Sequence, residues 1–236
     1  MAEAPSRSEQ RGRACCQWSV KVFALVVLTA AAAVFISHMA VMGQPVPSQN
    51  PAEQVLEDFS KGEADGFPQG WKASRSEAMT RQAYVVSREG ELSFLKTKGV
   101  DSRMRIFKRV AWDPKTYPVV TWRWRARSPI TGTEPVAALF VSLDQDFFGI
   151  PVNTKYIWSP NLVKGTVVEG GFFRPAQIAL RNNQDKVGEW IEERVNAYED
   201  FKRIHNHEPA PQAWGISLVT GPGIELDFGG IALAKQ

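Results

Sequence analysis

Short segments in which apolar and polar residues alternate recur along the chain, with turn signals between them. The clearest runs from Tyr117 to Arg127 (YPVVTWRWRAR), with the two-residue period of a strand. Val136 to Leu143 is apolar enough for a central strand, and Glu89-Gly90 and Asp113-Pro114 are turn sequences. Many short strands at this spacing predict a mostly β fold, a β-sandwich or jelly roll.

The expected strands share this spacing and are spread along the chain after residue 82. They are Ala83–Arg88, Glu91–Lys96, Met104–Val110, Tyr117–Arg127, Val136–Leu143, Thr154–Trp158, Thr166–Glu169, Gln177–Arg181, Trp190–Val195, Ala213–Thr220 and Ile224–Leu233. One short helix is expected at Ala197–Asn206, directly after the strand that begins at Trp190.

A different pattern occupies the N-terminus, where Val22 to Met42 is almost entirely apolar. A run of about twenty such residues is long enough to cross a bilayer as a helix. Basic residues precede it and the ten residues after it carry no charge, so the positive-inside rule places the N-terminus in the cytoplasm. A cleavable signal peptide ending near Gly43 is the alternative, although the apolar run exceeds the usual signal core.

These features divide the chain into four segments: a cytoplasmic segment at 1–21, a transmembrane signal-anchor helix at 22–42, a linker at 43–51 and a periplasmic β-sandwich domain at 52–236. The expected location is the bacterial inner membrane, with the domain facing the periplasm. If the signal is cleaved, the domain is periplasmic.

The charge and the cysteine positions exclude one class of partner and one source of stability. The net charge is +3 and no block of Lys and Arg stands out, so nucleic acid is not an expected partner. Both cysteines, Cys15 and Cys16, precede the apolar run; the β domain therefore has no disulfide and depends on packing. No cofactor is expected.

Candidate ligand-binding residues come from the outward positions of the strands. Alternation places Trp122 and Trp124 on one face and Arg123 and Arg125 on the other. The tryptophans favour the core, which leaves the arginines to solvent, to an ion-paired ladder, or to a polyhydroxylated or anionic ligand.

Two further candidates are aromatic and acidic. Tyr156 and Trp158 share a face of one expected strand and either pack in the core or stack on sugar rings. Asp144, in the sequence Asp144-Gln145-Asp146, is either a turn residue or an oxygen ligand for a polar group or cation. No metal site is expected, and His205 and His207 fit a polar helix end.

Several short motifs occur together in a fixed order: WRWR from Trp122, YIWS from Tyr156, EWIEERVNAYEDF from Glu189, PQAWGISLVT from Pro211 and DFGGIAL from Asp227. In this order the chain resembles the bacterial domain-of-unknown-function family 3047. The resemblance implies an exported domain similar to galactose-binding jelly rolls, and it implies no established activity.

No nucleophile motif, phosphate loop or catalytic triad pattern is present, so no catalytic residue is assigned. The sequence favours a non-catalytic envelope protein that binds a carbohydrate or another envelope polymer. The alternatives are a structural protein with an envelope protein partner, and a glycan hydrolase or lyase.

Overall fold

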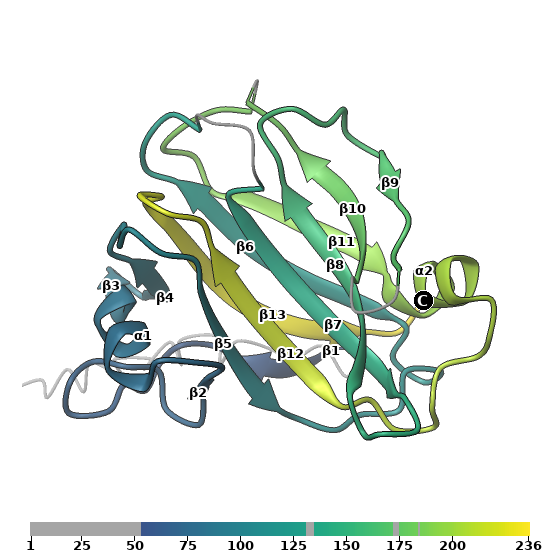
Figure 1. The fold of residues 1–236 in the computed structure, drawn as a ribbon. Coiled ribbons are helices and arrows are strands. Elements are labelled where there is room, and N and C mark those ends of the chain that lie inside the picture. Colours follow the sequence, from purple (N-terminus) through teal and green to yellow (C-terminus); the bar gives the residue numbers. More distant parts are fainter. Residues whose placement is uncertain (1–52, 131–134, 172–174, 184) are drawn as a thin grey trace, which may run out of the picture. The chain divides into compact units, whose positions relative to one another are not determined.

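The computed structural model describes residues 53–130, 135–171, 175–183 and 185–236, which form two β-sheets packed face to face (Figure 1). In one of them, called sheet 1, five strands are hydrogen-bonded in a row and a sixth strand, β1, pairs with β13 of that row. The row consists of β11 (Ile191–Asn196), β6 (Val119–Ala126), β13 (Leu226–Ala234), β4 (Leu92–Thr97) and β3 (Tyr84–Glu89), and β1 is Glu53–Glu57.

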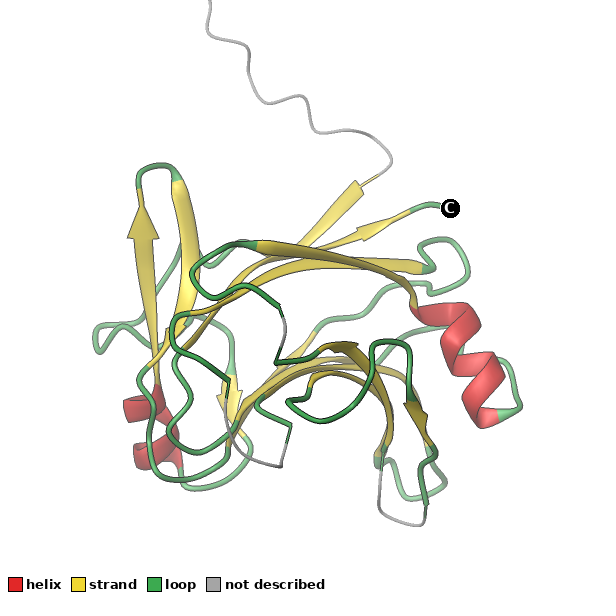
Figure 2. Ribbon diagram, turned by 90° about the horizontal axis from the view of Figure 1, so that it is seen from above, coloured by secondary structure: helices red, strands yellow, loops and turns green. Residues whose placement is uncertain are grey.

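The second sheet, sheet 2, has seven strands. In spatial order they are β2 (Lys72–Ala73), β5 (Met104–Arg109), β12 (Gly215–Thr220), β7 (Ala137–Gln145), β8 (Pro151–Trp158), β10 (Ala176–Arg181) and β9 (Val167–Val168). The β8–β10 pair is parallel and the other pairs are antiparallel. Viewed from above, sheet 2 is arched, with its edges turned away from sheet 1 (Figure 2).

The chain passes repeatedly from one sheet to the other, because β5, β7 and β12 belong to sheet 2 while β6, β11 and β13 belong to sheet 1. This crossing is typical of a jelly-roll sandwich. The mostly β fold predicted from the sequence is therefore confirmed, and most strand bounds lie within a few residues of the predicted ones.

Large aromatic side chains fill the space between the sheets. Trp122 packs on Tyr156 at 5.7 Å between ring centroids, and Trp124 packs on Trp158 at 5.5 Å. The two tryptophans of β6 also meet edge to face at 5.5 Å. All four rings are at most 1% exposed, so the assignment of Trp122 and Trp124 to the core is confirmed.

The expectation of one helix in the β domain is wrong, because the described residues contain two. The second helix of the chain, α2 (Ala197–His205), agrees with the prediction, and the Asn196 side chain caps its N-terminus by accepting from the amide of Glu199 at 3.0 Å. The unexpected helix, α1 (Glu77–Ala83), has seven residues, too few to show a helical period in the sequence.

Among the residues that the structure describes, no helix has the length and apolar character needed to cross a membrane. The apolar run Val22–Met42 lies outside those residues, and its role as an anchor stays a prediction.

Candidate functional site

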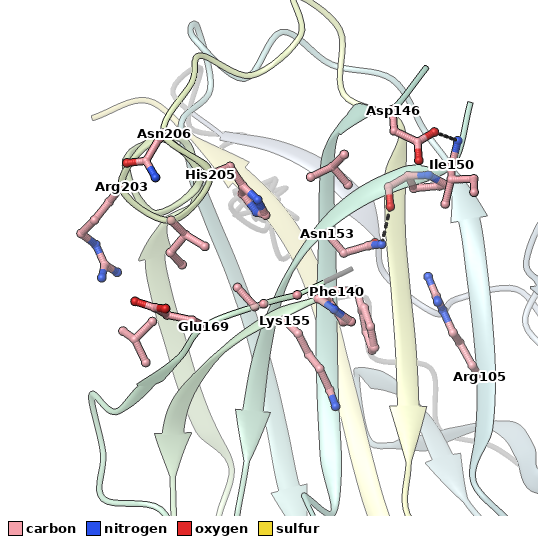
Figure 3. Close-up of a pocket in the computed structure, with 18 of the residues that line it drawn as sticks. Arg105, Phe140, Asp146, Ile150, Asn153, Lys155, Glu169, Arg203, His205 and Asn206 are labelled. Atoms are coloured by element: carbon pink, nitrogen blue, oxygen red, sulfur yellow. Dashed lines mark hydrogen bonds between the residues drawn. The ribbon is translucent and has the colours of Figure 1, made fainter. Parts of the chain in front are cut away.

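The outer face of sheet 2 carries a groove of about 1170 Å³. Arg105 of β5, Phe140 of β7 and both Asn153 and Lys155 of β8 line it (Figure 3). Its rim is formed by the β7–β8 turn, by the segment after β9 and by the C-terminal end of α2. We refer to this hollow below as the groove.

Strand alternation and register place these side chains together. Along β7, Leu139 and Val141 belong to the main core while Phe140 points to the opposite face. Phe140 pairs with Ser217 on one side and with Lys155 on the other. Since paired residues of neighbouring strands share a face, they form one row across β12, β7 and β8.

A neighbouring row on the same face is apolar and closed to solvent. Ala138, Ile157, Ala179 and Val219 pack with Phe140 into a small cluster, and Leu162 of the segment after β8 packs against it. This cluster holds the strands of the groove floor together on their outer side.

Two cations flank the aromatic ring of Phe140 on the floor. The guanidinium carbon of Arg105 lies 4.5 Å from the centroid of the Phe140 ring, and the Lys155 Nζ lies 5.4 Å from it. Arg105 Nη2 donates to Ser217 Oγ at 3.0 Å, and Lys155 Nζ donates to the Gln177 side chain at 3.3 Å. Phe140 is only 7% exposed, so its ring offers little stacking surface. The lining combines these hydrogen-bonding groups with apolar residues such as Ile150 and Val152.

The rim adds groups of both charges. Asp146 Oδ1 accepts from the amides of Phe148 and Ile150 at 2.9 and 2.8 Å, which fixes its carboxylate within the β7–β8 turn. Glu169 lies on the opposite side of the groove from Arg105 (Figure 3).

At the end of α2, His205 lines the groove with its Nε2 3.4 Å from Thr154 Oγ1. Burial, assisted by the neighbouring His207, lowers the pKa of His205 below its ordinary value. The ring is therefore neutral at pH 7 and offers one donor and one acceptor.

The structure corrects the stacking role considered for Tyr156 and Trp158. Both rings are 0% exposed and point into the main core, so neither has a face open to a sugar. Their polar atoms are also engaged, since the Tyr156 hydroxyl donates to Asp200 at 3.0 Å and Trp158 Nε1 donates to the carbonyl of Asn182 at 2.9 Å.

The two outward arginines of β6 lie on sheet 1, away from the groove. Arg125 is 12% exposed, and its three guanidinium nitrogens donate to Glu89 and Asp227. These bonds hold sheet 1 together and leave Arg125 little capacity for a ligand. Arg123 is half exposed, pairs with Glu192 at 2.9 Å and lines a second hollow of about 560 Å³.

Asp144 lies next to the groove-lining Asp146 but is not itself among the lining residues. Its Oδ1 accepts from the amide of Gln145 at 2.7 Å and its Oδ2 lies 3.7 Å from His207 Nδ1. Asp144 belongs to strand β7 and pairs with Val152 of β8, so the turn role considered for it is wrong. Within the described ranges, no three His, Cys, Asp or Glu side chains form a group suited to hold a metal ion.

The sequence analysis missed Arg105, Phe140 and Lys155. Lys155 gives a retrospective signal, since it is a charged residue within the strongly apolar and aromatic segment Thr154–Trp158. A lysine there needs a polar environment that a sheet core does not supply. Arg105 gives no such signal, because the alternating MRIFKR segment is ordinary for a half-exposed strand.

Comparison with solved structures finds sugar-related proteins at low identity. A carbohydrate-binding module specific for non-crystalline cellulose, CBM28, is 14% identical with a TM-score of 0.40, covering 78% of this chain and 94% of its own. The family 30 carbohydrate-binding module of a cellulosomal cellulase from Clostridium thermocellum is 9% identical with a TM-score of 0.45, covering 78% and 98%. A family 12 glycoside hydrolase is 9% identical with a TM-score of 0.36, covering 71% and 97%.

At these identities and TM-scores, the similarities do not show what this chain binds. No curated protein sequence matches the chain. Residues 149–221 match the family described as "Protein of unknown function (DUF3047)". This segment runs from the β7–β8 turn through β8, β10 and α2 to the end of β12. The resemblance to family 3047 is therefore confirmed over residues 149–221.

Proposed function

We propose that this chain is a carbohydrate-binding protein and that the groove on sheet 2 holds a sugar chain. The observation that carries the proposal is the hydrogen-bonding character of the groove floor, where Arg105, Asn153 and Lys155 lie around the nearly buried ring of Phe140. Sugar rings present hydroxyl groups that need such donors and acceptors.

The shape and lining of the groove disfavour other ligand classes. Pockets for small molecules are mostly apolar and bury most of the ligand, and the core of a protein interface is depleted in charged residues. The groove instead has charged side chains on its floor and rim, which suits a polar polymer that lies along the sheet.

The anchor predicted at Val22–Met42 adds a location to this proposal. A helix there would hold the sheet domain at the outer surface of the inner membrane, where envelope glycans are in reach. This part rests on the apolar run and its charged flank alone.

A blocking variant tests the groove directly. Gly171 lines the groove, and a Cβ added there meets no atom within 4 Å, so Gly171→Trp should add bulk without straining the fold. The full chain in mild detergent is titrated calorimetrically with cello-, xylo-, manno-, galacturono- and mannurono-oligosaccharides. We expect micromolar-to-millimolar binding of at least one oligosaccharide, roughly −4 to −8 kcal/mol, and at least tenfold weaker binding by Gly171→Trp.

Arg123→Ala serves as the control, because it alters the second hollow on sheet 1 and leaves the groove unchanged. Weaker binding by Arg123→Ala, with Gly171→Trp unchanged, would move the site to sheet 1. Absence of binding to every oligosaccharide would overturn the proposal. Mass spectrometry of the same mixtures tests the hydrolase or lyase alternative, which requires release of shorter sugars.

A further inference from the structure

The positive charge of the groove floor indicates which kind of sugar chain would bind there. Resting on that function, we propose that the sugar chain is acidic and that one of its carboxylate groups binds to the Arg105 guanidinium beside Phe140, with Lys155 as the second cation. The argument starts from the surroundings of Arg105.

Arg105 is a partly buried cation. Nη2 donates to the hydroxyl of Ser217, and Nε is buried without a hydrogen-bond partner. No carboxylate of the described residues forms an ion pair with Arg105 within 4.0 Å. Burial is the cause that lowers the pKa of Arg105, with no acidic neighbour opposing it.

Other partly buried arginines of the sandwich differ from Arg105 because they have carboxylate partners. Arg125, Arg127 and Arg181 have side chains that are 12%, 20% and 17% exposed, and each binds at least one carboxylate. Removing a charge from water without a counter-ion costs free energy. Arg105 departs from this pattern, and it lines the groove, where an incoming ligand could supply the missing anion.

Lys155 strengthens the positive character of the same spot. Lys155 lies on β8 and Arg105 on β5, with β12 and β7 between these strands. Both cations contact the ring of Phe140 on β7. Lys155 is only 8% exposed and its Nζ reaches Gln177. The two cations thus flank the Phe140 ring, and the guanidinium of Arg105 is the donor group that a planar carboxylate can accept.

The acidic groups of the rim do not neutralise Arg105. Asp146 is held by backbone amides of the β7–β8 turn, and Glu169 lies across the groove (Figure 3). Arg203 of α2 pairs with Asp200 at 2.7 Å, so that cation is already compensated. Arg105 on the groove floor therefore keeps its positive charge without a carboxylate partner among the described residues.

The test compares an acidic sugar chain with its neutral counterpart. The full chain in mild detergent is titrated with tetragalacturonate, with its fully methyl-esterified form and with tetramannuronate. The ester keeps the backbone and removes the negative charge. We expect at least tenfold tighter binding of one of the acids than of the ester, weakened at least tenfold by Arg105→Gln.

Arg109→Gln is the matched control. Arg109 lies on the same strand and outward face, stacks on Trp214 at 4.4 Å, and does not line the groove. Melting temperatures of both variants verify the fold. Equal loss in Arg105→Gln and Arg109→Gln would reveal a diffuse charge effect and overturn the inference.

Equal binding of acid and ester, or tighter binding of neutral oligosaccharides, would also overturn the acidic ligand while leaving carbohydrate binding in place. Failure of every oligosaccharide, acidic or neutral, would overturn the proposed function as well. The two failures are therefore distinguishable in one set of titrations.

Discussion

The two tryptophans of β6 allow the contribution of one buried hydrogen bond to folding stability to be measured, because the same substitution can be made at a neighbouring site that lacks the bond. Trp122 and Trp124 are 1% and 0% exposed and touch each other edge to face. Trp124 Nε1 donates to Glu193 at 2.9 Å, whereas Trp122 Nε1 is buried without a partner. The same substitution, Trp to Phe, removes similar volume at both sites.

The expected difference follows from the fate of each indole N–H. Each substitution costs roughly 1–3 kcal/mol for lost packing and cavity formation. Trp124→Phe also loses a hydrogen bond to a buried carboxylate, about 1.5 kcal/mol at the lower end because Arg181 still binds Glu193. Trp122→Phe instead removes an unsatisfied donor, which recovers about 1 kcal/mol or more. Trp124→Phe should therefore be the less stable by about 2.5 kcal/mol.

Urea unfolding of the full chain, followed by far-ultraviolet circular dichroism, measures this difference. At unchanged m value the difference in midpoint gives the difference in free energy of unfolding. In thermal melts it corresponds to about 5–10 °C for a domain of this size. Equal costs, or a larger cost for Trp122→Phe, would refute the reasoning that polar satisfaction separates the two positions.

Three further predictions concern other parts of the chain. Because the folded-state pKa of His205 is lowered, folding stability should be fully present above about pH 6.5 and fall as the pH drops below it; His205→Gln should flatten this fall in urea titrations at a series of pH values. Phe147 and Phe148 are 97% and 81% exposed and contact mainly each other, edge to face at 5.5 Å, so Phe147→Ser should change the free energy of unfolding by no more than about 0.5 kcal/mol, and a larger loss would place the Phe147 ring in a contact with the rest of the fold. Alkaline phosphatase fused after Gln236 should be active in whole Gram-negative cells if Val22–Met42 exports the domain, and a stable but silent fusion contradicts that topology.

Local periodicity was sufficient to predict most of the strands and helix α2. The segment from Tyr117 to Arg127 alternates because one side of β6 faces the core and the other faces outward. The capped start of α2 follows directly from Asn196 and the change of period after β11. The elements β1, β2 and α1 were not predicted because their segments show no clear period of apolar and polar residues.

The groove on sheet 2 could not be predicted from the sequence, for a different reason. In β8 the residues from Thr154 to Trp158 are buried on both faces, so alternation showed that Tyr156 and Trp158 share a face without showing which face meets the core. Arg105 approaches Phe140 only because β12, far along the chain, lies between β5 and β7. Strand order is a non-local property that no single segment encodes.

The central claim is that sugar binds along β7 and β8 on the outer face of sheet 2. Hydrogen–deuterium exchange of the full chain, with and without the tightest-binding oligosaccharide of the titrated panel, tests it most directly. We predict slower exchange in peptides that span Phe140, Asn153 and Lys155, and at the end of α2 near His205. Protection confined to sheet 1 around Arg123, or no protection at saturating sugar, would contradict the claim.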